Sequence, residues 1–106
     1  MKIRLDEQKR FEADTLVKVA LASTPRVQLD LYCVNPGQSQ KPHTHADQDK
    51  FYLVLEGSGR FAVSGSEQRL SAGEALLAPA GQEHGLVNDG PAPLVVLVVV
   101  SPPPRH

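Results

Sequence analysis

Three of the chain's four histidines have a spacing that suits metal ligands. His43 and His45 are two residues apart in Pro42-His43-Thr44-His45, and His84 follows a turn farther along the chain. Side chains two apart on a strand point to the same face, so a third imidazole from a neighbouring strand would complete three nitrogen ligands. Such a set suits divalent manganese, iron, nickel, copper or zinc. An isolated His-x-His pair is also common on exposed surfaces, so the pair alone leaves that interpretation open.

Strands are the elements expected to position these histidines. No segment has the length and 3.6-residue period of a good helix, and only residues 6–14 show a weak helical pattern. Many short β-branched and apolar segments separated by Gly- and Pro-containing turns indicate an all-β antiparallel sandwich or barrel. The predicted strands are Leu16–Leu21, Val27–Val34, Phe51–Glu56, Arg60–Ser64, Glu67–Leu70, Ala75–Ala78, Gly85–Val87 and Leu94–Ser101.

Two ordered motifs surround the histidines and cover about half the chain. Glycines in both can take turns that other residues disfavour, and a proline fixes the approach to the turn before the third histidine. An asparagine closes the second motif, where its side chain can hold a turn. The motif residues are Gly37, His43, His45 and Gly57 in residues 37–57, and Gly73, Pro79, Gly81, His84 and Asn88 in residues 73–88.

These two motifs resemble, in order and spacing, the two signature motifs of the cupin family, in its small single-domain form. The resemblance implies one cupin domain over residues 1–106, folded as a double-stranded β-helix, or jelly roll barrel. It further implies that His43, His45 and His84 point into the barrel mouth and bind one divalent transition metal there.

One position departs from the family pattern. The slot that usually holds a glutamate ligand falls on Lys50 when counted back from Gly57, and on Asp49 when counted forward from His45. A lysine cation cannot ligate a metal. Three alternatives stay open: Asp49 completes the metal site, three histidines bind the metal and leave open positions, or the protein binds no metal.

Lys50 is also a candidate ligand-binding residue, together with Tyr52 and Phe61. In the register set by Gly57, Lys50 faces the barrel interior with Tyr52 and Val54. A buried ammonium is costly unless paired, so it should find a carboxylate or an anionic ligand. The alternative is a solvated surface lysine, in which case Asp49 can turn inward.

The resemblance does not select a reaction, because cupins include dioxygenases, isomerases, decarboxylases, sugar-binding regulators and storage proteins. One hypothesis is a metal-dependent enzyme of the dioxygenase or isomerase type that acts on a small organic ligand. Another is a non-catalytic, metal-free module that binds a small anion or sugar, with Lys50 as its charged anchor. A third is a structural barrel in which the histidines have no function.

The net charge and the lengths of the apolar runs indicate which partners and which cellular location to expect. The 106 residues carry a formal net charge of −1, with acids and bases interleaved, which offers no basic stripe for nucleic acid. The N-terminus lacks the apolar core of a secretory signal, and the longest apolar run, residues 94–100, is too short to span a bilayer. We therefore expect a cytoplasmic protein that binds neither nucleic acid nor a membrane.

Two segments, residues 51–55 and 94–100, are apolar on both strand faces. One face can line the barrel while the other meets a second sheet or subunit. Because a 106-residue chain has only a modest core of its own, these faces predict a homodimer. The single cysteine, Cys33, is expected to be a small buried apolar residue, and the terminal His106, after a proline run, is expected to be disordered.

Overall fold

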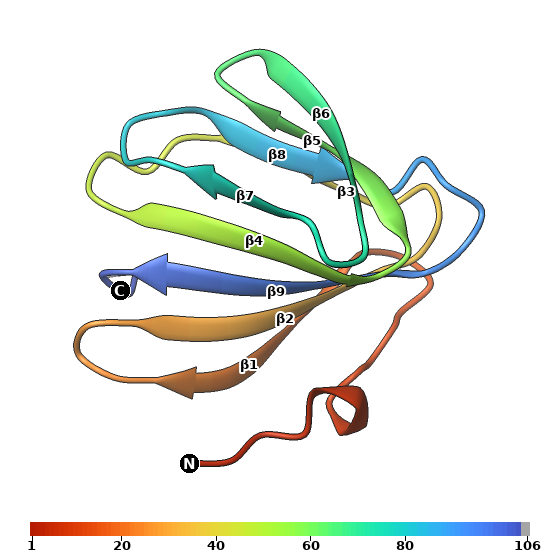
Figure 1. Cartoon of the computed structure of the whole chain (residues 1–106), viewed down its shortest axis with the longest axis horizontal. Coiled ribbons are helices and arrows are strands. Elements are labelled where there is room, and N and C mark those ends of the chain that lie inside the picture. Colours follow the sequence, from red (N-terminus) through yellow and green to blue (C-terminus); the bar gives the residue numbers. More distant parts are fainter. Residues whose placement is uncertain (105–106) are drawn as a thin grey trace.

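The computed structural model describes residues 1–104 and consists of two antiparallel sheets packed face to face (Figure 1). The five-stranded sheet has the order β1-β2-β9-β4-β7, and the four-stranded sheet has the order β3-β8-β5-β6. This arrangement confirms the expected all-β jelly roll; His106 lies outside the described residues. The strands are β1 (Val17–Ser23), β2 (Gln28–Val34), β3 (Ser39–His43), β4 (Asp49–Glu56), β5 (Ser58–Val63), β6 (Ser66–Ser71), β7 (Ala75–Ala78), β8 (His84–Val87) and β9 (Leu94–Ser101).

Helical structure is limited to one three-residue 3-10 turn, η1 (Leu5–Glu7), within the described residues 1–104. The weak helical pattern over residues 6–14 therefore does not form a helix. It lacks an apolar stripe long enough to be stabilised by packing, which is what sustains most short helices. Over these same 104 residues, no helix is both long and apolar enough to cross a membrane.

Strand β3 is the one strand that the sequence pattern did not predict. Its residues, Ser39-Gln40-Lys41-Pro42-His43, are polar and include a proline, so they lack both β-propensity and alternation. The strand forms because β8 pairs with it antiparallel, with Ser39 opposite Val87 and His43 opposite His84. Long-range pairing therefore decides the structure of this segment.

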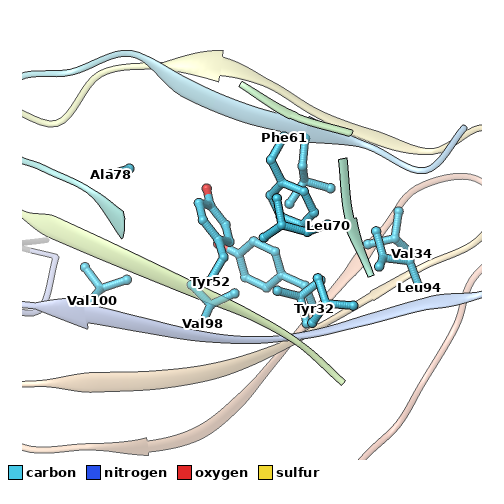
Figure 2. Close-up of a cluster of buried hydrophobic side chains, with 12 residues drawn as sticks. Tyr32, Val34, Tyr52, Phe61, Leu70, Ala78, Leu94, Val98 and Val100 are labelled. Carbon is cyan, nitrogen blue, oxygen red and sulfur yellow. The ribbon is translucent and has the colours of Figure 1, made fainter. Parts of the chain in front are cut away.

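The space between the two sheets is filled by the apolar inner faces of the strands. Figure 2 shows the rings of Tyr52 and Phe61 meeting there, with centroids 5.3 Å apart in an edge-to-face arrangement. Both side chains are fully buried. Alternate residues of β9, from Leu94 to Val100, point into the same core, as the alternation of a strand between two layers requires.

A second, smaller apolar cluster covers the outer face of β1, β2 and β9 with Val19, Leu31, Cys33 and Val95. The N-terminal segment lies outside this sheet (Figure 1), and its Arg10 N–H donates a hydrogen bond to Cys33 Sγ at 3.4 Å. Burial raises the pKa of the Cys33 thiol. Cys33 is thus the buried apolar residue that its strand position predicted.

The rest of the outer face carries an apolar row across β7, β4, β9 and β2, exposed at β7 and β4 and half-buried at β9 and β2. Leu77 pairs with Phe51, Phe51 with Val99, and Val99 with Leu29. Phe51 and Leu77 are 36% and 57% exposed, which is unusual for large apolar side chains that lie side by side. We propose this row as the interface of the predicted homodimer.

We expect light scattering to give twice the chain mass of 11.5 kDa at micromolar concentration. The double variant Phe51→Asp, Leu77→Asp should give the monomer mass, because burying two carboxylates in an apolar interface is unfavourable. The exposed Gln68→Asp on β6 serves as a control that adds charge elsewhere. A monomeric wild type would contradict the homodimer.

Candidate metal centre

The fold brings His43, His45 and His84 together. Their candidate ligand atoms all lie within 4.8 Å of one another, and the ring centroids of His43 and His84 are 4.3 Å apart. His43 ends β3 and His84 begins β8, where the two residues are paired. His45 lies beyond the end of β3, so the connection to β4, rather than strand alternation, directs its ring toward the other two. Gly81 N–H donates to His45 O at 2.8 Å and ties this connection to the turn before His84.

Two of the rings are oriented by the backbone. His43 Nδ1 lies 3.0 Å from Lys41 O, and His84 Nδ1 lies 3.0 Å from Gln82 O. A carbonyl oxygen can only accept, so each Nδ1 carries the proton and each Nε2 keeps its lone pair. Carbonyl acceptors of this kind commonly fix metal-binding histidines.

His84 Nε2 is the one side-chain nitrogen or oxygen, among the described residues, that is both completely buried and without a hydrogen-bond partner. An unsatisfied buried polar atom is costly, and a metal ion would satisfy it. Burial lowers the pKa of His84 and of His43, which keeps both imidazoles neutral and able to ligate at neutral pH. The residues therefore fit a divalent transition metal by orientation, lone pairs and charge.

Gly85 permits the close approach of β3 to β8. A Cβ built on Gly85 would lie 2.8 Å from Gln40 O and 2.9 Å from Pro42 N, both backbone atoms that cannot easily move. A larger residue beside His84 would push β3 away, together with His43. At the other end of β8, Asn88 donates to Val34 O and Ala92 O and accepts from Gly90 N–H, so it holds the turn, as its position in the motif suggested.

Asp49 and Lys50 point to opposite sides of β4. Asp49 is exposed, and its Oδ1 accepts a hydrogen bond from Ala80 N–H at 2.9 Å, so its carboxylate holds a turn and is not part of the histidine cluster. Lys50 is 4% exposed and faces the interior. Its Nζ lies 5.1 Å from the Tyr32 ring centroid and 5.4 Å from that of Tyr52. Burial lowers the pKa of Lys50 to about 8, and the neighbouring Lys18 contributes.

A pocket of about 200 Å³ opens beside the cluster. Tyr52 and Phe61, which the sequence suggested as its lining, instead belong to the core between the sheets. Tyr32 takes their place, and sequence reasoning missed it. The polar inner face of β2 was the available signal, because Gln28, Asp30 and Tyr32 alternate with apolar residues. The pocket is lined by Lys18, Gln28, Asp30, Tyr32, His43, His45, Gln48, Lys50, Val100 and Pro104.

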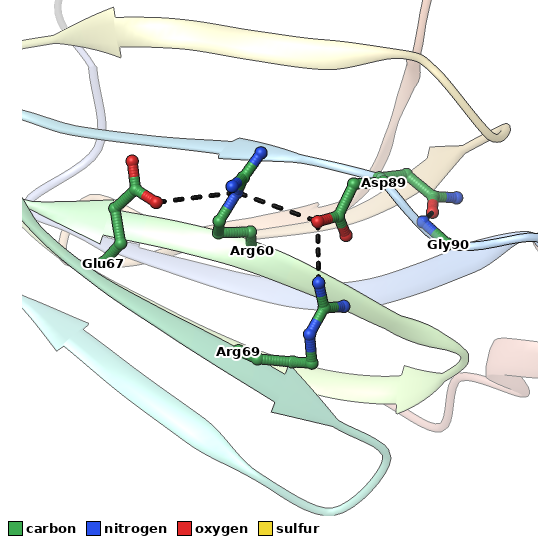
Figure 3. A network of polar contacts seen from close by, with 6 residues as sticks. Arg60, Glu67, Arg69, Asp89 and Gly90 are labelled. Atoms are coloured by element: carbon green, nitrogen blue, oxygen red, sulfur yellow. Dashed lines mark hydrogen bonds and ion pairs between the residues drawn. The ribbon is translucent and has the colours of Figure 1, made fainter.

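The main ion-pair network lies elsewhere, on the outer face of the four-stranded sheet (Figure 3). Asp89 accepts from Arg69 at 2.6 Å and lies 3.7 Å from Arg60, which also approaches Glu67 at 3.6 Å. The hydrogen bond from Arg69 lowers the pKa of Asp89. These side chains are largely solvated, so the network ties β5 and β6 to the loop after β8 without forming a site.

Two packed antiparallel sheets with three inward histidines at one end define a double-stranded β-helix protein with a candidate metal centre. Residues 30–100 match the family described as "Cupin domain", and the chain belongs to the cupin family.

Two solved structures similar to this chain share its fold over nearly their whole length. The Thermus thermophilus protein TT1209 has a TM-score of 0.94 and 38% identity over 98% of this chain and 100% of that one. An RmlC-like cupin from Desulfovibrio desulfuricans has a TM-score of 0.87 and 26% identity over 98% of this chain and 99% of that one.

Two curated relatives match over shorter spans. The tetracenomycin polyketide synthase protein TcmJ of Streptomyces glaucescens is 40% identical over 63% of this chain and 45% of its own length. The dimethylsulfoniopropionate lyase DddW of Ruegeria pomeroyi is 37% identical over 69% of this chain and 47% of its own length. The chain thus spans less than half the length of these relatives.

Proposed function

We propose that this cupin, as one domain, binds one divalent transition metal through His43, His45 and His84 and receives a small organic ligand in the adjoining pocket. The observation that carries the proposal is His84 Nε2, which is buried and unpartnered in a cluster whose candidate ligand atoms all lie within 4.8 Å of one another. Three nitrogen ligands leave coordination positions open for a ligand. Since Asp49 caps the turn at Ala80, we do not include it among the ligands.

The bound metal would supply Lewis-acid polarisation of a ligand oxygen. The chain's own residues contribute the surroundings. Backbone carbonyls hold the rings of His43 and His84 in one orientation, which leaves little reorganisation on metal binding. Lys50 places a positive charge at the pocket wall, and the buried rings of Tyr32 and Tyr52 lie beside its ammonium.

The relatives' names support a small-molecule ligand without selecting a reaction. Besides the polyketide synthase protein and the lyase, a Thermotoga maritima oxalate-binding protein is 31% identical over 61% of this chain and 54% of its own length. A metal-free binding module is the second candidate. The specific observation that favours it is Lys50, because a cation near the histidines weakens metal affinity through charge repulsion.

Metal titration separates these two candidates. Untagged protein, titrated calorimetrically with manganese, iron, nickel, copper and zinc ions, should take up about one ion per chain for at least one of them. His84→Gln should weaken that binding at least about 100-fold, because one of three ligands is lost and the amide is a poor substitute.

Gln68→Ala, an exposed substitution on β6 outside the pocket lining, is the control and should keep the wild-type affinity. Circular dichroism should show that each variant keeps the β-rich spectrum. Absence of stoichiometric uptake for all five ions, or unchanged affinity in folded His84→Gln, would favour the metal-free module.

A further inference from the structure

We infer that the pocket beside the histidines takes a small carboxylic acid, and that the carboxylate binds between the Lys50 ammonium and the Gln48 side-chain amide. The inference deepens the proposed function and rests on it, because it specifies the ligand class of the same pocket. Three observations carry it: the ammonium of a largely buried lysine without an anionic partner, the amide of a largely buried glutamine without a hydrogen-bond partner, and an excess of positive charge on the pocket wall.

Lys50 is buried without an anionic partner. It is 4% exposed, and within residues 1–104 its ammonium makes no hydrogen bond or ion pair. Its contacts are the faces of Tyr32 and Tyr52, which attract a cation but accept none of its three protons as an oxygen would. Burying an ammonium without an anionic partner costs free energy, and an anionic ligand oxygen in the pocket would compensate for that cost.

Gln48 lies on the same pocket wall and is also unpaired. It is 6% exposed, and its side-chain amide has no hydrogen-bond partner among the described residues. An amide and an ammonium on largely buried side chains, both without a protein partner and both on the wall of one small pocket, can bind the same polar ligand. The amide N–H can donate to one oxygen of a carboxylate while Lys50 donates to the other.

The charges that line the pocket also favour an anion. Lys18 and Lys50 both place their ammonium groups near the Tyr32 ring, at 5.2 and 5.1 Å from its centroid. Asp30 is the single carboxylate among the described lining residues, and it already accepts a hydrogen bond from Gln28 Nε2 at 2.9 Å. Two lysines against one carboxylate leave the lining cationic, and a bound divalent metal would make it more so.

A carboxylate fits this site better than a phosphate or a neutral sugar. Phosphates are typically held by helix N-termini or by runs of backbone N–H groups, and the single described helix, η1, lies outside the five-stranded sheet and away from this pocket. A neutral sugar would leave the Lys50 charge uncompensated. The volume of about 200 Å³ restricts the ligand to a small molecule.

Calorimetric titration of metal-free protein at pH 7 and low salt tests the inference with three probes: malonate, its neutral isostere malonamide, and glycerol 3-phosphate. Malonate should bind at least about tenfold more tightly than malonamide, as expected for a charge-assisted hydrogen bond. Lys50→Met should remove this preference. Lys41→Met, which removes an exposed lysine outside this pocket, should retain it.

Equal affinities for malonate and malonamide would overturn the inference, as would an unchanged malonate affinity in folded Lys50→Met. Tighter binding of glycerol 3-phosphate than of malonate would replace the carboxylate with a phosphate ester. Metal uptake is scored separately on the same samples. If malonate binding depends on Lys50 but the protein takes up no metal, only the metal proposal is overturned. If the protein takes up metal but does not prefer malonate over malonamide, only this inference is overturned.

Discussion

Replacing Lys50 with methionine should stabilise the metal-free, ligand-free protein by about 3 kcal/mol at pH 7. Burial lowers the pKa of this lysine from 10.5 to about 8, so holding its ammonium in the folded state costs free energy. Methionine has a similar length, carries no charge and packs against the rings of Tyr32 and Tyr52. Urea denaturation gives the free energy of unfolding of both proteins.

The same pKa gives a pH dependence with a definite sign. Between pH 8 and 10.5 the unfolded chain holds the Lys50 proton more tightly than the folded chain, so the stability of the wild type rises with pH there. From pH 7 to pH 9.5 the gain from Lys50 should be about 2 kcal/mol. Burial raises the pKa of Cys33, which acts in the opposite direction, so the difference between wild type and Lys50→Met isolates the lysine.

The exposed Lys41→Met is the control, and its stability should stay within about 0.5 kcal/mol of the wild type at both pH values. If Lys50→Met were no more stable than the wild type at pH 7, the ammonium would have a partner in solution. A stabilised Lys50→Met would show that the wild-type lysine lowers stability, which is common for residues kept for binding.

Gly57→Ala should lower the free energy of unfolding by about 4 kcal/mol or more. Gly57 joins β4 to β5 with a φ of +77°, and a Cβ there would collide with the backbone carbonyl oxygen of Pro93. Neither group can move without displacing a strand, since Leu94 begins β9 and packs in the core. The cost therefore combines backbone strain with a steric clash.

Gly37→Ala separates these two contributions. Gly37 has a similar φ of +87°, but a Cβ there would meet no atom within 4 Å. It should cost only about 1 kcal/mol, the strain of a left-handed conformation. Equal losses in the two variants, measured by urea denaturation, would show that the contact with Pro93 is relieved by a small shift.

The fold could be predicted from sequence because local signals and tertiary structure agree along most of the chain. Residues 75–78 and 94–101 form strands with the predicted bounds, since their apolar runs end at turn residues. Strand β3 is the exception, because its polar residues extend only when β8 supplies partners for their backbone groups. A single sequence carries no local signal for such long-range pairing.

In the candidate site, too, some features could be predicted from the sequence and others depend on the tertiary structure. The sequence determined which residue types were present, namely three histidines in two motifs and a lysine in the usual glutamate slot. Motif spacing together with strand alternation also predicted that Lys50 faces inward. Tertiary structure alone decided that Asp49 bonds to Ala80, that Tyr52 and Phe61 lie in the core, and that Tyr32 and Gln48 line the pocket.

The sequence could not predict the full pocket lining, because side-chain identity and strand alternation are local, whereas a pocket wall is assembled from strands distant in sequence. Lys50 lies on β4 and its neighbour Tyr32 on β2, on either side of β9, and the pairing of both strands with β9 brings the Lys50 ammonium to 5.1 Å from the Tyr32 ring centroid. The alternation of β2 and β4 shows which side chains face inward. Only the register of β9 against both strands decides which of them meet at the histidines.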